Sequence, residues 1–252
     1  MKRLWLAVLS AMVFSGCAEV AGLETSLQSK HGPLAYLYDS EKIAVKQAGS
    51  LRVGSVIVED VLPETTSVTK ESGFFLPLLV FNVWKYDYQS RLGYSQLSND
   101  YKAFIKDSFI EELRRSGKFS YVDDKGDGDM EIDLRVKGIS MKAPMRKAGS
   151  VIFVLYAVSY RQGYWAGPAE VQVTADAVLK KEGKEIFRQE FRGRGNTGLL
   201  QGKNLDIGDF TTAMIEALSS ALKNLNENVV REINNVWTGQ TPGGFPFHDA
   251  AS

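Results

Sequence analysis

Side chains that commonly carry out catalysis or bind metals are scarce in this chain, whose 252 residues include two histidines and one cysteine. His31 lies near the N-terminus and His248 near the C-terminus. A serine or cysteine nucleophile needs a histidine base within hydrogen-bonding distance, and a zinc site needs three or four ligands placed close together. Two histidines at opposite ends of the sequence supply neither arrangement. We therefore expect no catalytic residues, no metal site and no cofactor.

The acidic segment 123–129 (DDKGDGD) contains enough carboxylates to suggest a calcium site. An EF-hand loop places oxygen ligands at positions 1, 3 and 5, a glycine at position 6 and a glutamate at position 12. No frame through this segment supplies that set. Glycine and aspartate are also the residues that tight turns prefer, so we expect a turn between two strands.

The glycines of segment 193–198 (GRGNTG) have the spacing of a phosphate-binding loop, but no Lys-Ser/Thr pair follows them. Arg188, Arg192 and Arg194 could form a small basic patch for a lipid or glycan phosphate. An exposed strand end is the simpler interpretation of these arginines. A hydrolase that uses paired carboxylates has no recognisable sequence pattern, so it stays open as the least favoured function.

The single cysteine, Cys17, follows a segment with the layout of a secretory signal. Two basic residues precede an apolar run over 4–14, and a serine and a glycine stand directly before the cysteine. An apolar core of about a dozen residues is shorter than the roughly 20 that a membrane-spanning helix needs. A lone cysteine cannot form a disulfide within its own chain. The pattern predicts that residues 1–16 are a signal peptide.

The four residues Phe14-Ser15-Gly16-Cys17 resemble the lipobox of bacterial lipoproteins, although phenylalanine replaces the usual aliphatic residue. The resemblance implies cleavage before Cys17 and attachment of acyl chains such as palmitate, so the first partner is the membrane itself. Two or more acyl chains give stable anchoring. Ala18 stands where enterobacterial lipoproteins often carry the aspartate of inner-membrane retention. We therefore expect an anchor in the cell outer membrane, on its periplasmic side.

Composition indicates an ordinary globular body. Hydrophobic residues make up 44% of the chain and charged residues 24%, and 30 basic residues balance 30 acidic ones. This balance gives no electrostatic attraction to nucleic acid. We expect a lipidated N-terminus with a flexible tether over 17–33, a single domain over 34–238 and a flexible tail over 239–252.

Alternating apolar residues predict the strands of that domain. We expect strands over 51–62, 119–122, 130–139, 169–181 and 185–192, with a hairpin turn at 182–183. The apolar segment 74–84 contains Pro77, which allows an edge strand only after the proline. We expect loops over 63–72, 86–98 and 193–209.

Apolar residues at helical spacing predict two helices, over 99–116 and 210–236. Ser98 or Asn99 is the expected N-cap of the first helix, and Gly117 its left-handed C-cap. The order of elements predicts an α+β fold, with a mostly antiparallel sheet and two helices packed on one face.

The least ordinary stretch is 149–167, which contains eight consecutive apolar residues over 151–158 and then several aromatic residues. It could be a fully buried strand. It could also be an apolar loop or short helix that contacts a membrane or a partner protein, with the cations Lys142, Arg146 and Lys147 beside it favouring anionic headgroups. The candidate contact residues are Val151, Ile152, Phe153, Val154, Leu155, Tyr156, Tyr164 and Trp165.

The string Ser116-Gly117-Lys118-Phe119 and the order of elements over 51–236 resemble small envelope lipoproteins. These include YajG-type lipoproteins, auxiliary lipoproteins of ABC-type transporters and penicillin-binding-protein activator lipoproteins. The resemblance implies a lipid-anchored, non-enzymatic accessory protein that binds a protein or lipid partner in the periplasm. A carrier of lipid or another apolar ligand is the alternative.

Overall fold

The computed structural model describes residues 29–39, 42–43, 46, 49–62, 67–71, 80–122, 126, 128–154, 157–166, 168–198, 200–202 and 207–239. Its strands are β1 (Ser50–Val58), β2 (Ser67–Glu71), β3 (Val80–Ser90), β4 (Ser120–Val122), β5 (Met130–Val154), β6 (Ala157–Ala166), β7 (Glu170–Lys181), β8 (Lys184–Asn196) and β9 (Leu200–Gly202). Its helices are the short 3-10 helix η1 (Tyr94–Gln96), α2 (Tyr101–Ser116) and α3 (Ile207–Trp237).

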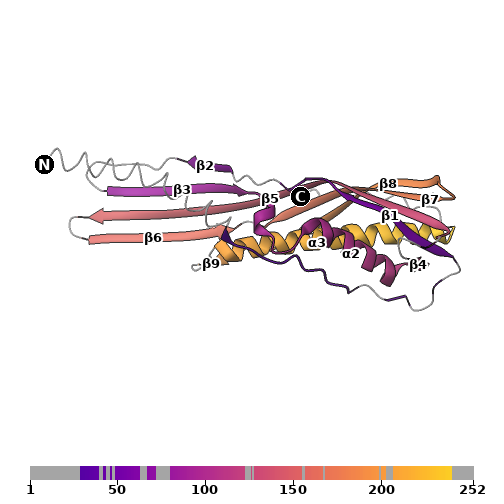
Figure 1. Cartoon of the computed structure of the whole chain (residues 1–252). Coiled ribbons are helices and arrows are strands. Elements are labelled where there is room, and N and C mark those ends of the chain that lie inside the picture. The colour runs from indigo at the N-terminus through magenta and orange to yellow at the C-terminus, as the bar shows by residue number, and fades with distance from the viewer. Residues whose placement is uncertain are drawn as a thin grey trace.

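The strands form two groups that share β5 (Figure 1). The first group, which we call the body sheet, has the order β4-β1-β5-β7-β8. Strand β1 runs parallel to β4 and β5, whereas the β5–β7 and β7–β8 pairs are antiparallel. α3 packs on β7 and β8, and α2 packs on α3. The predicted α+β fold, with a mostly antiparallel sheet and two helices on one face, is confirmed.

The body core explains why these segments form these elements. In β7 every second side chain, from Val171 to Leu179, is buried, and the residues between them are half-buried or exposed. α3 presents its own apolar stripe to this face, and its buried members include Met214, Leu218, Leu222, Leu225, Val229 and Ile233. The alternate residues of β7 and the apolar stripe of α3, which repeats every 3.6 residues, therefore pack into one core cluster.

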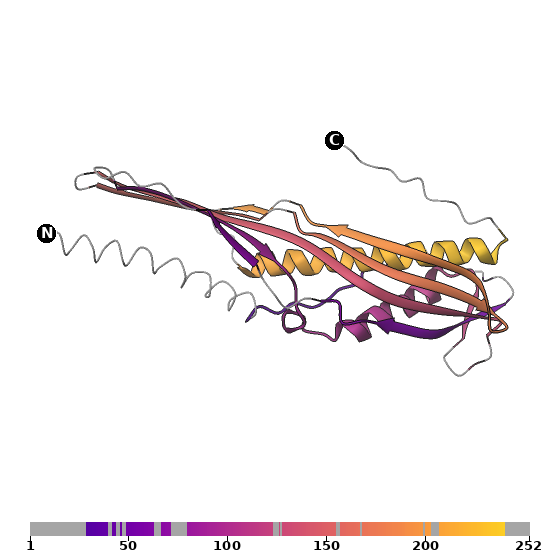
Figure 2. The same cartoon turned by 90° about the horizontal axis from the view of Figure 1, so that it is seen from above.

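The second group of strands is an antiparallel arm with the order β2-β3-β5-β6-β9. It consists of β3, residues 143–154 of β5 and β6, with the short strands β2 and β9 at its edges. Figures 1 and 2 show that it extends past the ends of both helices. The predicted strand over 130–139 was therefore too short, since β5 continues to Val154.

Three segments that were expected to be loops contain strands instead. The predicted loop over 63–72 contains β2, and the predicted loop over 86–98 contains the second half of β3. The predicted loop over 193–209 contains the end of β8 as well as β9, and α3 already begins at Ile207.

The ends of α2 also differ from expectation. Asp100, not Ser98 or Asn99, is the N-cap, and its carboxylate accepts hydrogen bonds from the backbone N–H groups of Lys102 and Ala103. Gly117 has φ −72°, so the predicted left-handed C-cap is wrong. A Cβ at Gly117 would lie 2.5 Å from the carbonyl oxygen of Leu113, so close approach explains this glycine.

Residues 32–39, 42–43 and 46, which we call the strap, contact the helices before the chain enters β1. Gly32 forms a β-bridge with Leu97. The Leu34 N–H donates to Asn99 Oδ1 (2.9 Å), and Leu34 itself is buried. At the other end, Lys46 donates to the carbonyl oxygens at the end of α2, where the helix dipole favours a cation. Contacts with the body thus begin two residues before the expected domain start.

Candidate functional site

The arm is the candidate site, because one of its faces continues the covered face of the body sheet. In β5, Ala143 and Met145 are buried, whereas Lys142 and Pro144 between them are exposed. Odd-numbered residues of this part of β5 therefore lie on the face that the helices cover in the body. Because alternate residues of a strand share a face, 147, 149, 151 and 153 lie on the same face further along.

The strand register extends this assignment to the neighbouring strands. We call the resulting surface the helix-side face of the arm. Its cross-strand rows are Tyr88–Met145–Ala166, Tyr86–Lys147–Tyr164, Trp84–Gly149–Gln162, Asn82–Val151–Tyr160 and Val80–Phe153–Val158. Of these fifteen residues only Asn82, Lys147 and Gln162 are neither apolar, aromatic nor glycine. Five rows of mostly apolar and aromatic residues thus extend the core face of the body.

Neither described helix covers this part of the sheet. α3 lies on β7 and β8, while α2 lies on α3 and touches β1 and β4; neither has extensive contact with β2, β3 or β6. Both views show the arm beyond the helix ends (Figures 1 and 2). Within the described residues, the face that two helices bury in the body therefore has no helix over it in the arm.

The opposite, outer face of the arm is more polar. Its rows are Asp87–Arg146–Trp165, Lys85–Ala148–Gly163, Val83–Ser150–Arg161 and Phe81–Ile152–Ser159. Four of the five charged residues in the long strands of the arm belong to these rows, and only Lys147 belongs to the helix-side face. The arm is thus two-faced along most of its length.

The structure divides the predicted contact residues between the two faces. Val151, Phe153 and Tyr164 are on the helix-side face, whereas Ile152, Val154 and Trp165 are on the outer face. Leu155 and Tyr156 lie outside the described residues. The backbone of 151–154 is strand, so the alternative of a loop or short helix is wrong there.

Residues 86–90 of the arm, predicted to be part of a loop, form the second half of β3. Trp84, Tyr86 and Tyr88 recur at every second position, a spacing that indicates a strand with one aromatic face. The polar residues between them, Lys85 and Asp87, made the segment resemble a loop. The alternation was the available signal.

The outer face of the body sheet carries a network of ion pairs. Lys180 binds both Glu131 and Asp133, and Glu131 also pairs with Arg52. Burial opposes ionisation of Asp133, but hydrogen bonds from Lys180 and Ser55 outweigh it and lower the pKa of this carboxyl. A general acid in a hydrolase needs a raised pKa, so Asp133 does not fit that role.

The three arginines of the predicted basic patch have separate surroundings. Arg188 pairs with Glu185, and Arg192 pairs with Glu190. Glu190 also binds Lys137, and hydrogen bonds from Lys137 and Arg192 lower its pKa. Two of the three arginines are therefore neutralised by neighbours, which disfavours a phosphate patch.

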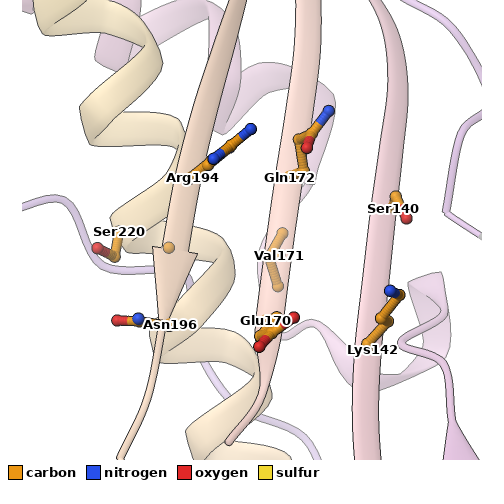
Figure 3. Close-up of a pocket in the computed structure, with 9 residues that line it drawn as sticks. Ser140, Lys142, Glu170, Val171, Gln172, Arg194, Asn196 and Ser220 are labelled. Carbon is orange, nitrogen blue, oxygen red and sulfur yellow. The ribbon is translucent and has the colours of Figure 1, made fainter. Parts of the chain in front are cut away.

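Arg194 instead lines a shallow hollow on the outer face where β5, β7 and β8 lie side by side (Figure 3). Two cross-strand rows, Ser140–Gln172–Arg194 and Lys142–Glu170–Asn196, line it. None of its charged side chains has an ion pair within the described part of the chain. Val171, Gly195 and Ser220 also line the hollow, so its lining mixes charged, polar and apolar groups.

Other reactive groups do not assemble into a site. Tyr36 donates a hydrogen bond of 3.1 Å to the buried Glu112, and burial and the charge of Glu112 raise the pKa of Tyr36. His31 is exposed, while Cys17 and His248 lie outside the described residues. No cluster of three or more His, Cys, Asp or Glu able to hold a metal occurs among the residues described. Neither α2 nor α3 is long and apolar enough to cross a membrane.

Comparison with known proteins yields only distant likenesses. No protein-family model and no curated protein matches the chain. It is similar to a solved Xanthomonas campestris protein of the DUF330 family, with 10% identity and a TM-score of 0.42 over 83% of this chain and 99% of that one. It is also similar to a neuraminyllactose-binding hemagglutinin homologue from Helicobacter pylori, with 10% identity and a TM-score of 0.37 over 83% of this chain and 95% of that one. Neither description names an enzymatic activity, but likenesses at this level carry no argument about function.

Proposed function

We propose that the chain is a lipid-anchored, non-enzymatic accessory protein of the bacterial envelope and that its arm binds a protein or lipid partner. The observation that carries this proposal is the helix-side face of the arm. A face that is core in the body continues, still apolar and aromatic, onto strands that no described helix covers. A contiguous apolar surface of this kind is typical of an interaction site.

The anchor is the second part of the proposal. The lipobox-like residues before Cys17 support lipidation at this cysteine and an address on the periplasmic side of the cell outer membrane. Residues 17–31 then connect the lipid to the strap. These 15 residues reach at most about 50 Å when fully extended.

The alternative of a carrier of apolar ligands receives less support from the described residues. The interior between helices and sheet is filled by large side chains such as Phe109, Phe119 and Phe191, all of them buried. The hollow on the outer face is open and has a mixed lining of charged, polar and apolar groups. Large buried side chains in this interior disfavour a carrier that holds its ligand between the helices and the sheet.

Site-specific photo-crosslinking in the native envelope tests the proposal. We would place a photoreactive residue at Val151, on the helix-side face of the arm, or at Ile186 near the opposite end of the body sheet. Ile186 is a matched control, because it is an apolar residue with 45% of its surface exposed. We expect a discrete crosslinked species from Val151 and none from Ile186. The same products from both positions, or none from Val151, would contradict the proposal.

A further inference from the structure

We propose that the partner of the arm is the surface of a lipid bilayer, on which the arm lies with its helix-side face toward the acyl chains. This inference rests on the proposed function of the arm and adds the chemical class of its partner. The proposed contact surface includes residues of β3 and β6 as well as the apolar part of β5.

The distribution of aromatic residues favours a membrane interface. Tryptophan and tyrosine prefer the boundary between headgroups and acyl chains, where the ring is in an apolar environment and its polar atom reaches water. The helix-side face of the arm carries five such residues, Trp84, Tyr86, Tyr88, Tyr160 and Tyr164. The outer face carries one, Trp165. This asymmetry is that of an interfacial amphipathic element.

The open edges of the arm indicate that it lies along the surface of a bilayer. β9 pairs only with residues 164–166 of β6, and β2 pairs only with residues 85–89 of β3. Beyond these pairs, no strand among the described residues pairs with the outer edge of β3 or of β6. Backbone groups without a partner strand are costly in hydrocarbon, whereas water and headgroups at the interface can satisfy them. An interfacial position therefore suits the arm better than a fully immersed one.

The charges of the arm favour a bilayer over a second copy of the chain as its partner. The three long strands of the arm contain four basic residues, Lys85, Arg146, Lys147 and Arg161, against the single acidic residue Asp87. This excess attracts anionic headgroups. On the helix-side face itself Lys147 is the one charged residue of these strands, so face-to-face pairing of two arms would bring two such lysines to the contact without an acidic residue on that face to neutralise them.

The point where the N-terminal segment joins the body brings the anchor close to the arm. Gly32 pairs with Leu97, which lies in the connection that follows β3. A Cβ at Gly32 would lie 2.6 Å from the side chain of Ile215, which belongs to the first half of α3. The 15 residues from 17 to 31 reach at most about 50 Å, and the arm is about 40 Å long at 3.4 Å per residue. Lipid and arm can therefore contact the same surface together, and the anchor raises the local concentration of the arm.

Vesicle flotation of the unlipidated Cys17→Ser protein tests the inference without help from the anchor. The vesicles would contain phosphatidylcholine alone or an equal mixture with phosphatidylglycerol. We expect flotation with the mixed vesicles. The double variant Val151→Asp/Phe153→Asp should lower the bound fraction at least about tenfold, because two apolar residues leave the helix-side face. The matched variant Ile152→Asp/Val154→Asp adds the same charge on the outer face and should bind within about twofold of the parent.

Tryptophan emission gives a second readout with conservative variants that preserve an aromatic ring. On addition of mixed vesicles we expect a blue shift that Trp84→Phe abolishes and Trp165→Phe retains. Absence of flotation, equal loss in the two double variants, or a shift that depends on Trp165 would overturn the bilayer inference. A concentration-dependent shift in buffer alone would identify a second copy as the partner and would also overturn it. If Val151 still crosslinks to an envelope protein in those cases, the proposed function stands while the bilayer inference fails.

Discussion

The Tyr36 hydroxyl donates a hydrogen bond to the carboxylate of Glu112, whose side chain is completely buried. Ser116 Oγ donates to the same carboxylate from the next turn of α2. Because burial and the nearby negative charge raise its pKa, Tyr36 remains a protonated donor at neutral pH. The hydrogen bond from Tyr36 to the buried Glu112 therefore attaches the strap to α2.

Replacement of Tyr36 by phenylalanine should destabilise the protein. The buried carboxylate of Glu112 would lose one donor, which costs about 1–3 kcal/mol of unfolding free energy. Urea denaturation measures the loss. Tyr38→Phe is the matched control, since the Tyr38 hydroxyl has no hydrogen bond among the described residues, and it should change stability by less than about 0.5 kcal/mol. Equal losses in both variants would show that the hydrogen bond is not the cause.

Gly195→Ala should destabilise the contact between β8 and α3. A Cβ at this position would lie 2.1 Å from the carbonyl oxygen of Ala217 and 2.5 Å from the backbone nitrogen of Ala221. Helix backbone cannot move aside easily, so we expect a loss of about 1–3 kcal/mol. Gly138→Ala is the control, because nothing lies within 4 Å of its added Cβ. Thermal unfolding should show a lower midpoint for Gly195→Ala alone.

Asp133→Asn should lower stability at neutral pH and reduce its acid dependence. The folded state holds the pKa of Asp133 below its ordinary value of 3.8, so on acidification the unfolded state takes up the proton first. The stabilisation is therefore complete above about pH 4 and disappears as the pH falls through the folded-state pKa. We expect the variant to lose about 1 kcal/mol at pH 7 and to converge with the parent in acid.

Urea denaturation at a series of pH values measures this convergence. Glu170→Gln is a matched control on the same outer face, because Glu170 has no ion pair within the described ranges. Its profile should follow that of the parent. A constant difference between Asp133→Asn and the parent, from neutral pH into acid, would contradict the ionic explanation.

Asp100→Ala should destabilise α2 by about 1 kcal/mol, the usual cost of removing an N-cap. Its carboxylate accepts the free backbone N–H groups of Lys102 and Ala103 in the first turn. Ser98→Ala should change the unfolding free energy by less than about 0.5 kcal/mol, because α2 does not use this serine as its cap. A larger loss from Ser98→Ala than from Asp100→Ala would contradict this assignment.

The sequence predicts the body well because its elements are half-buried. β7 alternates apolar and polar residues, and α2 and α3 repeat apolar residues at helical spacing. The local pattern of each element therefore identifies its buried face. Capping is less well determined by sequence. Ser98, Asn99 and Asp100 are all good N-cap residues, and Asn99 is instead used to accept the Leu34 N–H.

The arm could not be predicted from local patterns. A bulge between Val136 and Gly138 breaks the alternation of β5, and Pro144 and Gly149 then weaken the strand signal. What makes this segment a strand is its antiparallel pairing with β3, which is distant in sequence. Local periodicity carries no information about that pairing.

Gly193 and Gly195 were assigned to a loop for a related reason. Glycine is depleted in strands, so its spacing favoured a turn. Both residues are buried in β8, and a Cβ on either would meet the backbone of α3. Close approach of a helix requires them there, and that helix lies far away in sequence.

β5 belongs to both sheets as one strand of 25 residues, without a loop at the junction. At about 3.3 Å per residue it is roughly 80 Å long, so a tilt of about 5° at one end moves the other end by about 7 Å. Since no loop separates the two parts of this strand, a tilt of the body sheet also displaces the tip of the arm. A change of orientation in the body is in this way converted into a larger displacement at the far end of the molecule.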